Sequence, residues 1–265
     1  MGAACGQCVE GLVSLLSPQE PFIACDDLNG IATVLCGGDA VLLKGQWILE
    51  HFKAVQERSL LAWISGSSSC LPLPRRQDLP KSAIWDPGVL IPRLARPYRR
   101  IKIVALSYSW LTQDHPDPLG QHLDLLVRAI KQWMAYFTVE FSWELAFFID
   151  WCSLYQEPRT LEEDESFNRA LRSVHVWYMN PWTDVWCLSR IPGYFSGLRQ
   201  TSYRKRGWPT FERAVSGMTV KSFGGNGSSG IVLDLGTFSD ETESWEVTER
   251  LCAVERNVLI TPQTF

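Results

Sequence analysis

The sequence has no long apolar run. A transmembrane helix needs about 20 consecutive, mostly apolar residues, and no uninterrupted stretch of this chain approaches that length. The N-terminus also lacks the charged region and the long apolar core of a secretory signal. We therefore expect a cytoplasmic protein that is soluble or merely anchored to a membrane surface.

Cysteines and histidines with the spacing of metal ligands are rare as well. The eight cysteines are spread over the whole chain, which is typical of reduced proteins inside the cell rather than of a disulfide scaffold. Only Cys5 and Cys8 form a CxxC pair, and no second CxxC or HxxxH follows. Because a structural zinc ion takes four ligands, no metal site is predicted.

The chain is not basic overall. Its formal net charge of -4 and its pI of about 5.6 argue against a general nucleic-acid-binding protein. Basic residues do gather in one stretch, which we interpret as a solvated connector because charge runs usually face water. These residues are Arg75, Arg76, Lys81, Arg93, Arg96, Arg99, Arg100 and Lys102.

Hydrophobic residues and tryptophan, by contrast, are plentiful. With 265 residues, 46% of them hydrophobic, the chain can bury a full core as one domain with additions or as two small domains. Several of the twelve tryptophans stand beside Gly, Pro or Asp, where large amphipathic rings can line a pocket or an interface. This composition indicates a binding surface without identifying its ligand.

The chain begins MGAACGQC. Gly2, with small residues behind it, resembles a myristoylation start, and Cys5 and Cys8 would be available for palmitoylation. Together they would give the two lipid signals that stable membrane attachment requires. Gly6 stands where the stricter pattern has Ser or Thr. Two interpretations stay open: attachment to a membrane surface through the N-terminus, and a disordered N-terminus without lipid.

The first hundred residues give a weak fold pattern. Residues 31–35 and 40–43 are predicted as short strands around the turn CGGD, and residues 46–58 have helical spacing. Ser, Gly, Pro and Arg dominate the stretch that follows, which marks a linker. The predicted organisation is a less regular N-terminal extension (1–64), a linker (65–100), an α/β domain (101–235) and an acidic C-terminal segment packing on that domain (236–265).

Strands and helices alternate from residue 101. The continuous apolar runs at 101–107 and 144–150 are typical of strands covered on both faces, while 119–137 and 161–174 have helical patterns. Further predicted elements are strands at 175–179 and 184–189 and a helix with Pro209 in its first turn. The alternation predicts an open, mostly parallel α/β sheet flanked by helices, with 101–107 and 144–150 as central neighbours.

Polar and aromatic side chains follow two of these strands. Residues 150–153 come at the end of one strand, and residues 107–110 at the end of another. Ligands of open parallel sheets bind beyond the carboxyl ends of the strands, so we expect both groups to line one rim. The alternative is local: Asp150 caps the next segment and Trp151 packs under a loop.

Three sequence blocks carry a resemblance. ALSYSW (105–110), FFIDWCSLYQ (147–156) and RGWPTFE (206–212) resemble the three blocks of the heterokaryon-incompatibility (HET) domain. They are more distantly similar to the Toll/interleukin-1 receptor (TIR) domain, which has a strand ending in Asp and a W-C-x-x-E helix. The resemblance covers about residues 100 to 220 and implies a flavodoxin-like, TIR-like sheet.

The chain also departs from these patterns. Pro209 and Thr210 replace the Cys-Leu or Thr-Leu that usually follows the Trp, and Phe211 stands where HET domains carry Gln. Pro209 should start a helix, which would put Glu212 in its first turn, where the helix dipole favours an anion.

Some TIR domains hydrolyse NAD, and the resemblance implies a corresponding site here with NAD as substrate and no cofactor. Glu212 would be the catalytic carboxylate that stabilises an oxocarbenium-like ribose. The alternative for Glu212 is a solvated first-turn residue near Arg213. The residues implied to bind substrate are Ser107, Tyr108, Trp110, Asp150, Trp151, Arg206 and Trp208.

Two other functions stay open. Many members of both families act as non-enzymatic modules that self-associate, which would make this protein a homo-oligomer in a stress or cell-death response. A concave pocket with Glu212 facing it would separate the enzyme from the interaction module. A third reading is a hydrolase that uses Cys152 with His175 or His122.

Overall fold

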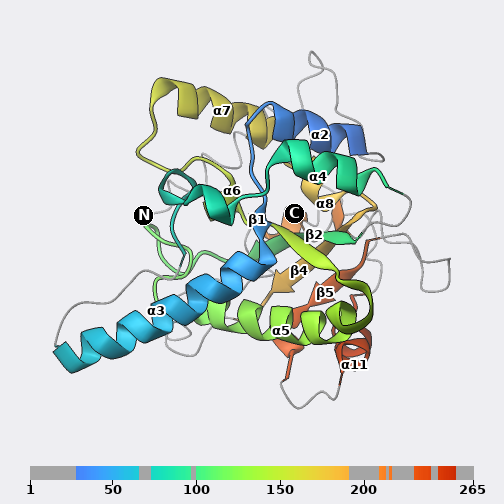
Figure 1. Cartoon of the computed structure of the whole chain (residues 1–265). Coiled ribbons are helices and arrows are strands. Elements are labelled where there is room, and N and C mark those ends of the chain that lie inside the picture. Colours follow the sequence, from blue (N-terminus) through green and yellow to red (C-terminus); the bar gives the residue numbers. More distant parts are fainter. Residues whose placement is uncertain are drawn as a thin grey trace.

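The computed structural model describes residues 28–65, 73–96, 100–190, 209–212, 215–216, 230–239 and 244–254, without the side chains of 58–65 and 138–141. These residues form a mixed α/β fold around one five-stranded, mostly parallel sheet (Figure 1). Within the described ranges, no helix is long and apolar enough to span a membrane.

The sheet has the strand order β1-β3-β2-β4-β5. Its strands are β1 (Leu43–Lys44), β2 (Ile101–Tyr108), β3 (Glu144–Phe148), β4 (Thr183–Leu188) and β5 (Val232–Asp234). β1 runs antiparallel to β3, and the other pairs are parallel, with Ala105 of β2 opposite Phe148 on one side and Val185 on the other. β2 and β3 are central, parallel neighbours, so that prediction is confirmed.

The strands form where apolar side chains are continuous. All of β2 except Lys102 is buried, and so is the whole of β4. Such strands are covered on both faces, and two separate buried clusters lie on the two sides of the sheet.

Helices cover both faces of the sheet, as Figure 1 shows. One face carries α2 (Leu28–Cys36), α4 (Pro87–Leu94), α7 (Leu161–Arg172) and α8 (His175–Tyr178), and the other carries α3 (Gly45–Ser65), α5 (Gln121–Phe141) and α11 (Trp245–Cys252). The short helix α6 (Asp150–Ser153) follows β3. Further short helical turns lie at Arg76–Asp78, Lys81–Ala83 and Leu235–Thr237. The fold is thus three layers with the sheet in the middle.

Local sequence signals begin several helices. The Thr160 hydroxyl accepts from the Glu163 backbone N–H, and the Glu163 side chain accepts from the Thr160 N–H, which completes a capping box before α7. The Asp117 carboxylate accepts from the backbone N–H groups of Gln121 and Leu123 at the start of α5. These caps satisfy backbone donors that a helix terminus leaves without partners.

Two predicted strands are wrong. Residues 31–35 belong to the helix α2, and residues 175–178 form the short helix α8. Both are short apolar runs, for which periodicity does not distinguish a buried strand from a buried helix. Of the predicted strand 40–43, only Leu43 is in β1.

The described residues between 28 and 96 are part of the α/β domain rather than a separate extension and linker. β1 pairs with β3, and Ile31 of α2 and Leu90 of α4 are buried in the core on one face of the sheet. Arg76, which the sequence predicts to be solvated, is only 8% exposed. The Pro-rich composition reflects turns and a helix start at Pro87, not a free connector.

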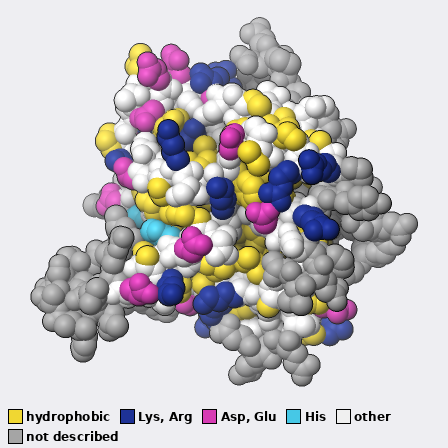
Figure 2. Space-filling model, in the orientation of Figure 1, with side chains coloured by type: hydrophobic (Ala, Val, Ile, Leu, Met, Phe, Trp, Pro, Cys, Tyr) yellow, Lys and Arg dark blue, Asp and Glu magenta, His cyan; other side chains and the backbone are white. Residues whose placement is uncertain are grey.

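Acidic and basic side chains are interspersed over the described part of the face in Figure 2. They alternate there with apolar side chains rather than gathering into one field of a single sign.

Candidate functional site

The strand order reverses next to β2. β3 follows β2 in the chain and lies on one side of it, whereas β4 lies on the other side. In an open α/β sheet, such a switch point leaves a crevice beyond the carboxyl ends of the strands, where ligands bind. Here the switch point lies between β2 and β4, and Ser107 and Tyr108 end β2 there.

Glu212 lies at this switch point. Residues 209–212 are helical, and the Ser107 Oγ donates to the Glu212 Oε2 at 2.5 Å. Ser107 and Glu212 are 0% and 2% exposed, respectively. The alternative of a solvated first-turn carboxylate is therefore wrong, and the structure brings together two residues that are 105 positions apart.

Asp150 gathers a second group at the same edge. Its carboxylate accepts from the Tyr108 hydroxyl, from the Trp110 Nε1 at 3.0 Å and from the Trp151 backbone N–H at 2.6 Å. Burial raises the pKa of Asp150 above its usual value, although these three donors oppose the shift. Asp150 thus fixes the orientation of two aromatic side chains from β2 and the residues just after it.

The two tryptophans at this edge differ in exposure. Trp110 is partly exposed, whereas Trp151 is buried and donates through its Nε1 to the Leu73 carbonyl at 2.9 Å. Their rings meet edge-on with centroids 5.5 Å apart. Trp110 thus keeps part of its surface exposed, and Trp151 packs against the 73–78 segment, as the local alternative for Trp151 expects.

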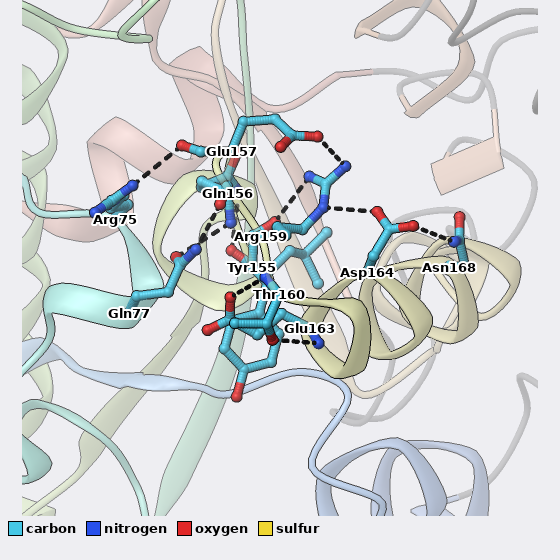
Figure 3. A network of polar contacts seen from close by, with 11 residues as sticks. Arg75, Gln77, Tyr155, Gln156, Glu157, Arg159, Thr160, Glu163, Asp164 and Asn168 are labelled. Carbon is cyan, nitrogen blue, oxygen red and sulfur yellow. Dashed lines mark hydrogen bonds and ion pairs between the residues drawn. The ribbon is translucent and has the colours of Figure 1, made fainter.

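The segment 73–78 crosses the chain that follows β3. The Gln77 side chain pairs with the backbone of Gln156, since the Gln77 amide donates to the Gln156 backbone carbonyl and the Gln156 backbone N–H donates to the Gln77 Oε1 (Figure 3). The Gln156 amide donates in turn to the Asp150 carbonyl at 3.0 Å. Arg75 reaches the Glu157 carbonyl at 3.1 Å. These contacts hold the Asp150 turn against the body of the domain.

A small cavity lies beneath Tyr108. Its volume is about 20 Å³, room for about one water molecule, and Tyr108, His115, His122 and Trp151 are among the residues around it. A dinucleotide does not fit there. Glu212 does not line this cavity. The cavity is therefore not the concave pocket facing Glu212 that would distinguish an enzyme from an interaction module.

Both histidines near this cavity have structural partners. His115 accepts from the Asp117 N–H at its Nδ1 and pairs with the Leu73 carbonyl at its Nε2, which defines a neutral ring, and burial lowers its pKa. The His122 Nε2 lies 3.2 Å from the Ser109 carbonyl oxygen. In the described part of the chain, no three His, Cys, Asp or Glu residues are placed to hold a metal ion.

Cys152 is placed unfavourably for a nucleophile. It is fully buried, its thiol donates to the Pro74 carbonyl at 3.2 Å, and burial raises its pKa well above the usual value. Reactive cysteines are exposed and have lowered pKa values. The geometry therefore counts against the hypothesis of a hydrolase with Cys152 as its nucleophile.

This environment predicts selective alkylation. Brief treatment of the native protein with iodoacetamide at neutral pH should label the exposed Cys36 and leave Cys152 and Cys187 unmodified, because both are buried. Peptide mass spectrometry measures this, and labelling after unfolding in urea is the control. Rapid labelling of Cys152 in the native protein would contradict its burial in the structure and would support the hypothesis of a Cys152 hydrolase.

Tyr178 was not found from the sequence, whereas Ser109 is among the residues 107–110 that were expected at this edge. The Tyr178 hydroxyl donates to the Leu106 carbonyl at 3.1 Å, and Ser109 has a fully buried hydroxyl without a hydrogen-bond partner. The strand predicted at 175–179 hid Tyr178, which lies in the short helix α8. Arg206 and Trp208 lie outside the described residues, as do Gly2, Cys5 and Cys8.

Comparison of the chain with protein-family models, with curated proteins and with solved structures finds no match. The resemblance to HET and TIR domains therefore rests on the three sequence blocks alone.

Proposed function

We propose that the protein is a TIR/HET-like NAD glycohydrolase in which Glu212 is the catalytic carboxylate. The observation that carries this proposal is the 2.5 Å contact between Ser107 and Glu212, at the point of the sheet where open α/β folds bind ligands. Asp150, with its two aromatic partners, supplies the second wall of the same edge.

The reaction would break the bond between nicotinamide and ribose. Nicotinamide leaves with the electron pair of that bond, which neutralises its ring nitrogen and leaves positive charge on the ribose. Glu212 stabilises this oxocarbenium-like ribose electrostatically. Water then adds to the anomeric carbon and loses a proton, so the products are nicotinamide, ADP-ribose and one proton.

The other residues of the edge have distinct roles in this proposal. Ser107 orients Glu212, and Asp150 fixes the Tyr108 hydroxyl and the Trp110 indole by hydrogen bonds, so that both aromatic side chains are held at the edge where the substrate would bind. Trp151 supports Trp110. Arg206 would pair with a phosphate and Trp208 would stack on a ring; both assignments come from the resemblance.

The topology supports the proposed family. Numbered in chain order, the four parallel strands have the order 2-1-3-4, which corresponds to the first part of the flavodoxin-like order 2-1-3-4-5. TIR domains have a sheet of this type. The proposed fold is accordingly flavodoxin-like, with β1 added on the β3 side.

The direct experiment follows nicotinamide release. The purified full-length chain is incubated with NAD, and nicotinamide and ADP-ribose are quantified by chromatography over several protein concentrations. We expect both products in equal amounts. Absence of release at every concentration, including those at which the protein assembles, would reject the enzyme.

A second candidate function is a self-associating interaction module. One observation favours it: Glu212 is 2% exposed, so a substrate reaches its carboxylate only if the surrounding chain moves. In this alternative, the Ser107–Glu212 pair fixes the end of β2 for packing alone. Concentration-dependent assembly measured by light scattering, together with no nicotinamide release, would support the module over the enzyme.

We further propose that Gly2 is acylated and that the otherwise cytoplasmic protein is thereby held at membranes. Gly2→Ala removes the only acceptor for N-terminal myristate, and it should shift the protein expressed in eukaryotic cells from the membrane fraction to the cytosol. Membrane fractionation and quantitative blotting measure the change. If the parent and the variant partition equally between the membrane fraction and the cytosol, the proposal that Gly2 is acylated fails.

A further inference from the structure

The hydroxyl of Ser109 is a buried polar group that the proposed reaction does not yet use. Ser109 directly follows β2 and is 1% exposed, and its hydroxyl has no hydrogen-bond partner in the part of the chain that the structure describes. Its backbone carbonyl, by contrast, pairs with the His122 Nε2. A buried hydroxyl without a partner destabilises a folded protein, so this group requires an explanation.

The alternation of side chains along β2 places Ser109 on the same face of the sheet as Ser107. Successive side chains of a strand point to opposite faces. Four residues in alternate positions belong to the buried cluster on the α5 face or pack against it: Val104, Leu106, Tyr108 and Trp110. Ile103 and Ala105 belong to the cluster on the other face. Because Trp110 still follows the alternation, Ser109 faces the same side as Ala105 and Ser107.

That face is the one that carries Glu212. The Ser107 Oγ contacts the Glu212 Oε2 at 2.5 Å, and Val215, three residues after Glu212, packs against the cluster on this face. Residues two apart on an extended chain are separated by about 6.6 Å. Ser109 is therefore the next side chain beyond Ser107 on this face, in the direction in which ligands of open sheets bind.

A ribose placed against Glu212 matches this position and this chemistry. Its hydroxyls lie on the two carbon atoms that follow the anomeric carbon, a span shorter than the about 6.6 Å between the two serines. Like the Ser109 hydroxyl, they can both donate and accept a hydrogen bond. A phosphate at the same place would be repelled by the Glu212 carboxylate, whereas a ribose hydroxyl is neutral.

We infer that the Ser109 hydroxyl is a substrate contact that forms a hydrogen bond with a hydroxyl of the nicotinamide ribose. The inference rests on the proposed function, because the ribose reaches Ser109 only if its anomeric carbon lies at Glu212. Ser109 and Glu212 are both enclosed, so the movement that admits the substrate has to uncover both. The substrate then supplies the partner that the Ser109 hydroxyl lacks in the ligand-free protein.

Ser109→Ala should weaken NAD binding without destabilising the ligand-free protein. The variant removes a hydroxyl that has no partner before the substrate binds, so its Tm should stay within about 1 °C of the parent or rise. Affinity is measured by isothermal titration calorimetry with NAD in the Glu212→Gln protein, which should not consume the ligand. Adding Ser109→Ala to that protein should raise Kd about fivefold or more.

Ser166→Ala is the matched control. Ser166 is also buried, but its hydroxyl donates to the Asp39 Oδ1 at 3.1 Å. This variant loses a hydrogen bond of the ligand-free protein, so it should lower Tm and leave Kd for NAD unchanged.

NAD analogues that lack one hydroxyl of the nicotinamide ribose identify the contact. Ser109→Ala should have no effect on the Kd of either the 2′-deoxy or the 3′-deoxy analogue, because one partner of the hydrogen bond is already absent. An unchanged Kd for NAD, an effect that persists with both analogues, or a Tm lowered as in Ser166→Ala would overturn the inference. Nicotinamide release by the parent would then leave the proposed function intact. A parent that neither binds NAD nor releases nicotinamide would reject the proposed function, and this contact with it.

Discussion

Glu212→Gln should abolish nicotinamide release while leaving the fold intact. The amide has nearly the size of the carboxylate and its oxygen can still accept from the Ser107 hydroxyl, so we expect Tm within a few degrees of the parent. The negative charge that would stabilise the oxocarbenium is lost, which should lower kcat by at least about 10²-fold. Chromatographic product assays on matched protein preparations measure the effect.

Glu246→Gln is the matched control for this substitution. Glu246 also lies in the first turn of a helix, α11, but its side chain is exposed whereas that of Glu212 is buried. This variant should retain the activity of the parent. If Glu212→Gln releases nicotinamide as fast as the parent, Glu212 is structural and the proposed catalytic role fails.

Arg76→Met should be the most destabilising of the substitutions considered. The Arg76 guanidinium donates to the carbonyls of Asp39 at 2.7 Å, Gly38 at 2.5 Å and Ser153 at 3.3 Å, and it stacks on the Tyr155 ring at 3.8 Å. Methionine fills similar space but leaves the Asp39 and Gly38 carbonyls without this donor, whereas the Ser153 carbonyl still accepts from the Val41 N–H. We expect a loss of about 2 to 4 kcal/mol in the free energy of unfolding, since each unsatisfied buried group costs about 1 to 3 kcal/mol.

The neighbouring Arg75 provides the control. Its ion pair with Asp78 is largely exposed, with 31% and 53% of the two side chains accessible, and exposed pairs contribute at most about 1 kcal/mol. Arg75→Met should therefore cost far less than Arg76→Met. Urea unfolding monitored by tryptophan fluorescence measures both, and equal losses would show that Arg76 does not join the segments as described.

The sheet was predictable where the chain is uniformly apolar. β2 and β3 bury nearly every side chain, so their positions and parallel pairing followed from composition alone. α2 and α8 were missed because a short apolar run has no distinguishing period. The role of Arg76 was missed because its acceptors are backbone carbonyls, which no side-chain pattern reveals.

The residues that meet at the candidate site were predictable, but their exposure was not. Strand-end position and the resemblance to HET and TIR domains gave Ser107, Asp150 and Glu212, and the structure brings Ser107 and Glu212 into contact. Sequence alone predicted an open rim, whereas Glu212 is enclosed. Enclosure depends on which segments cover the strand ends, and such long-range packing leaves no local signal in the sequence.

The most direct test of the central claim is a crystal structure of the Glu212→Gln protein with NAD bound. The proposed function predicts the nicotinamide ribose at the end of β2, with its anomeric carbon within about 4 Å of the side chain at position 212, since reacting groups approach to about 3 to 3.5 Å. NAD bound away from this edge, or no binding at millimolar NAD, would contradict a catalytic site at Glu212.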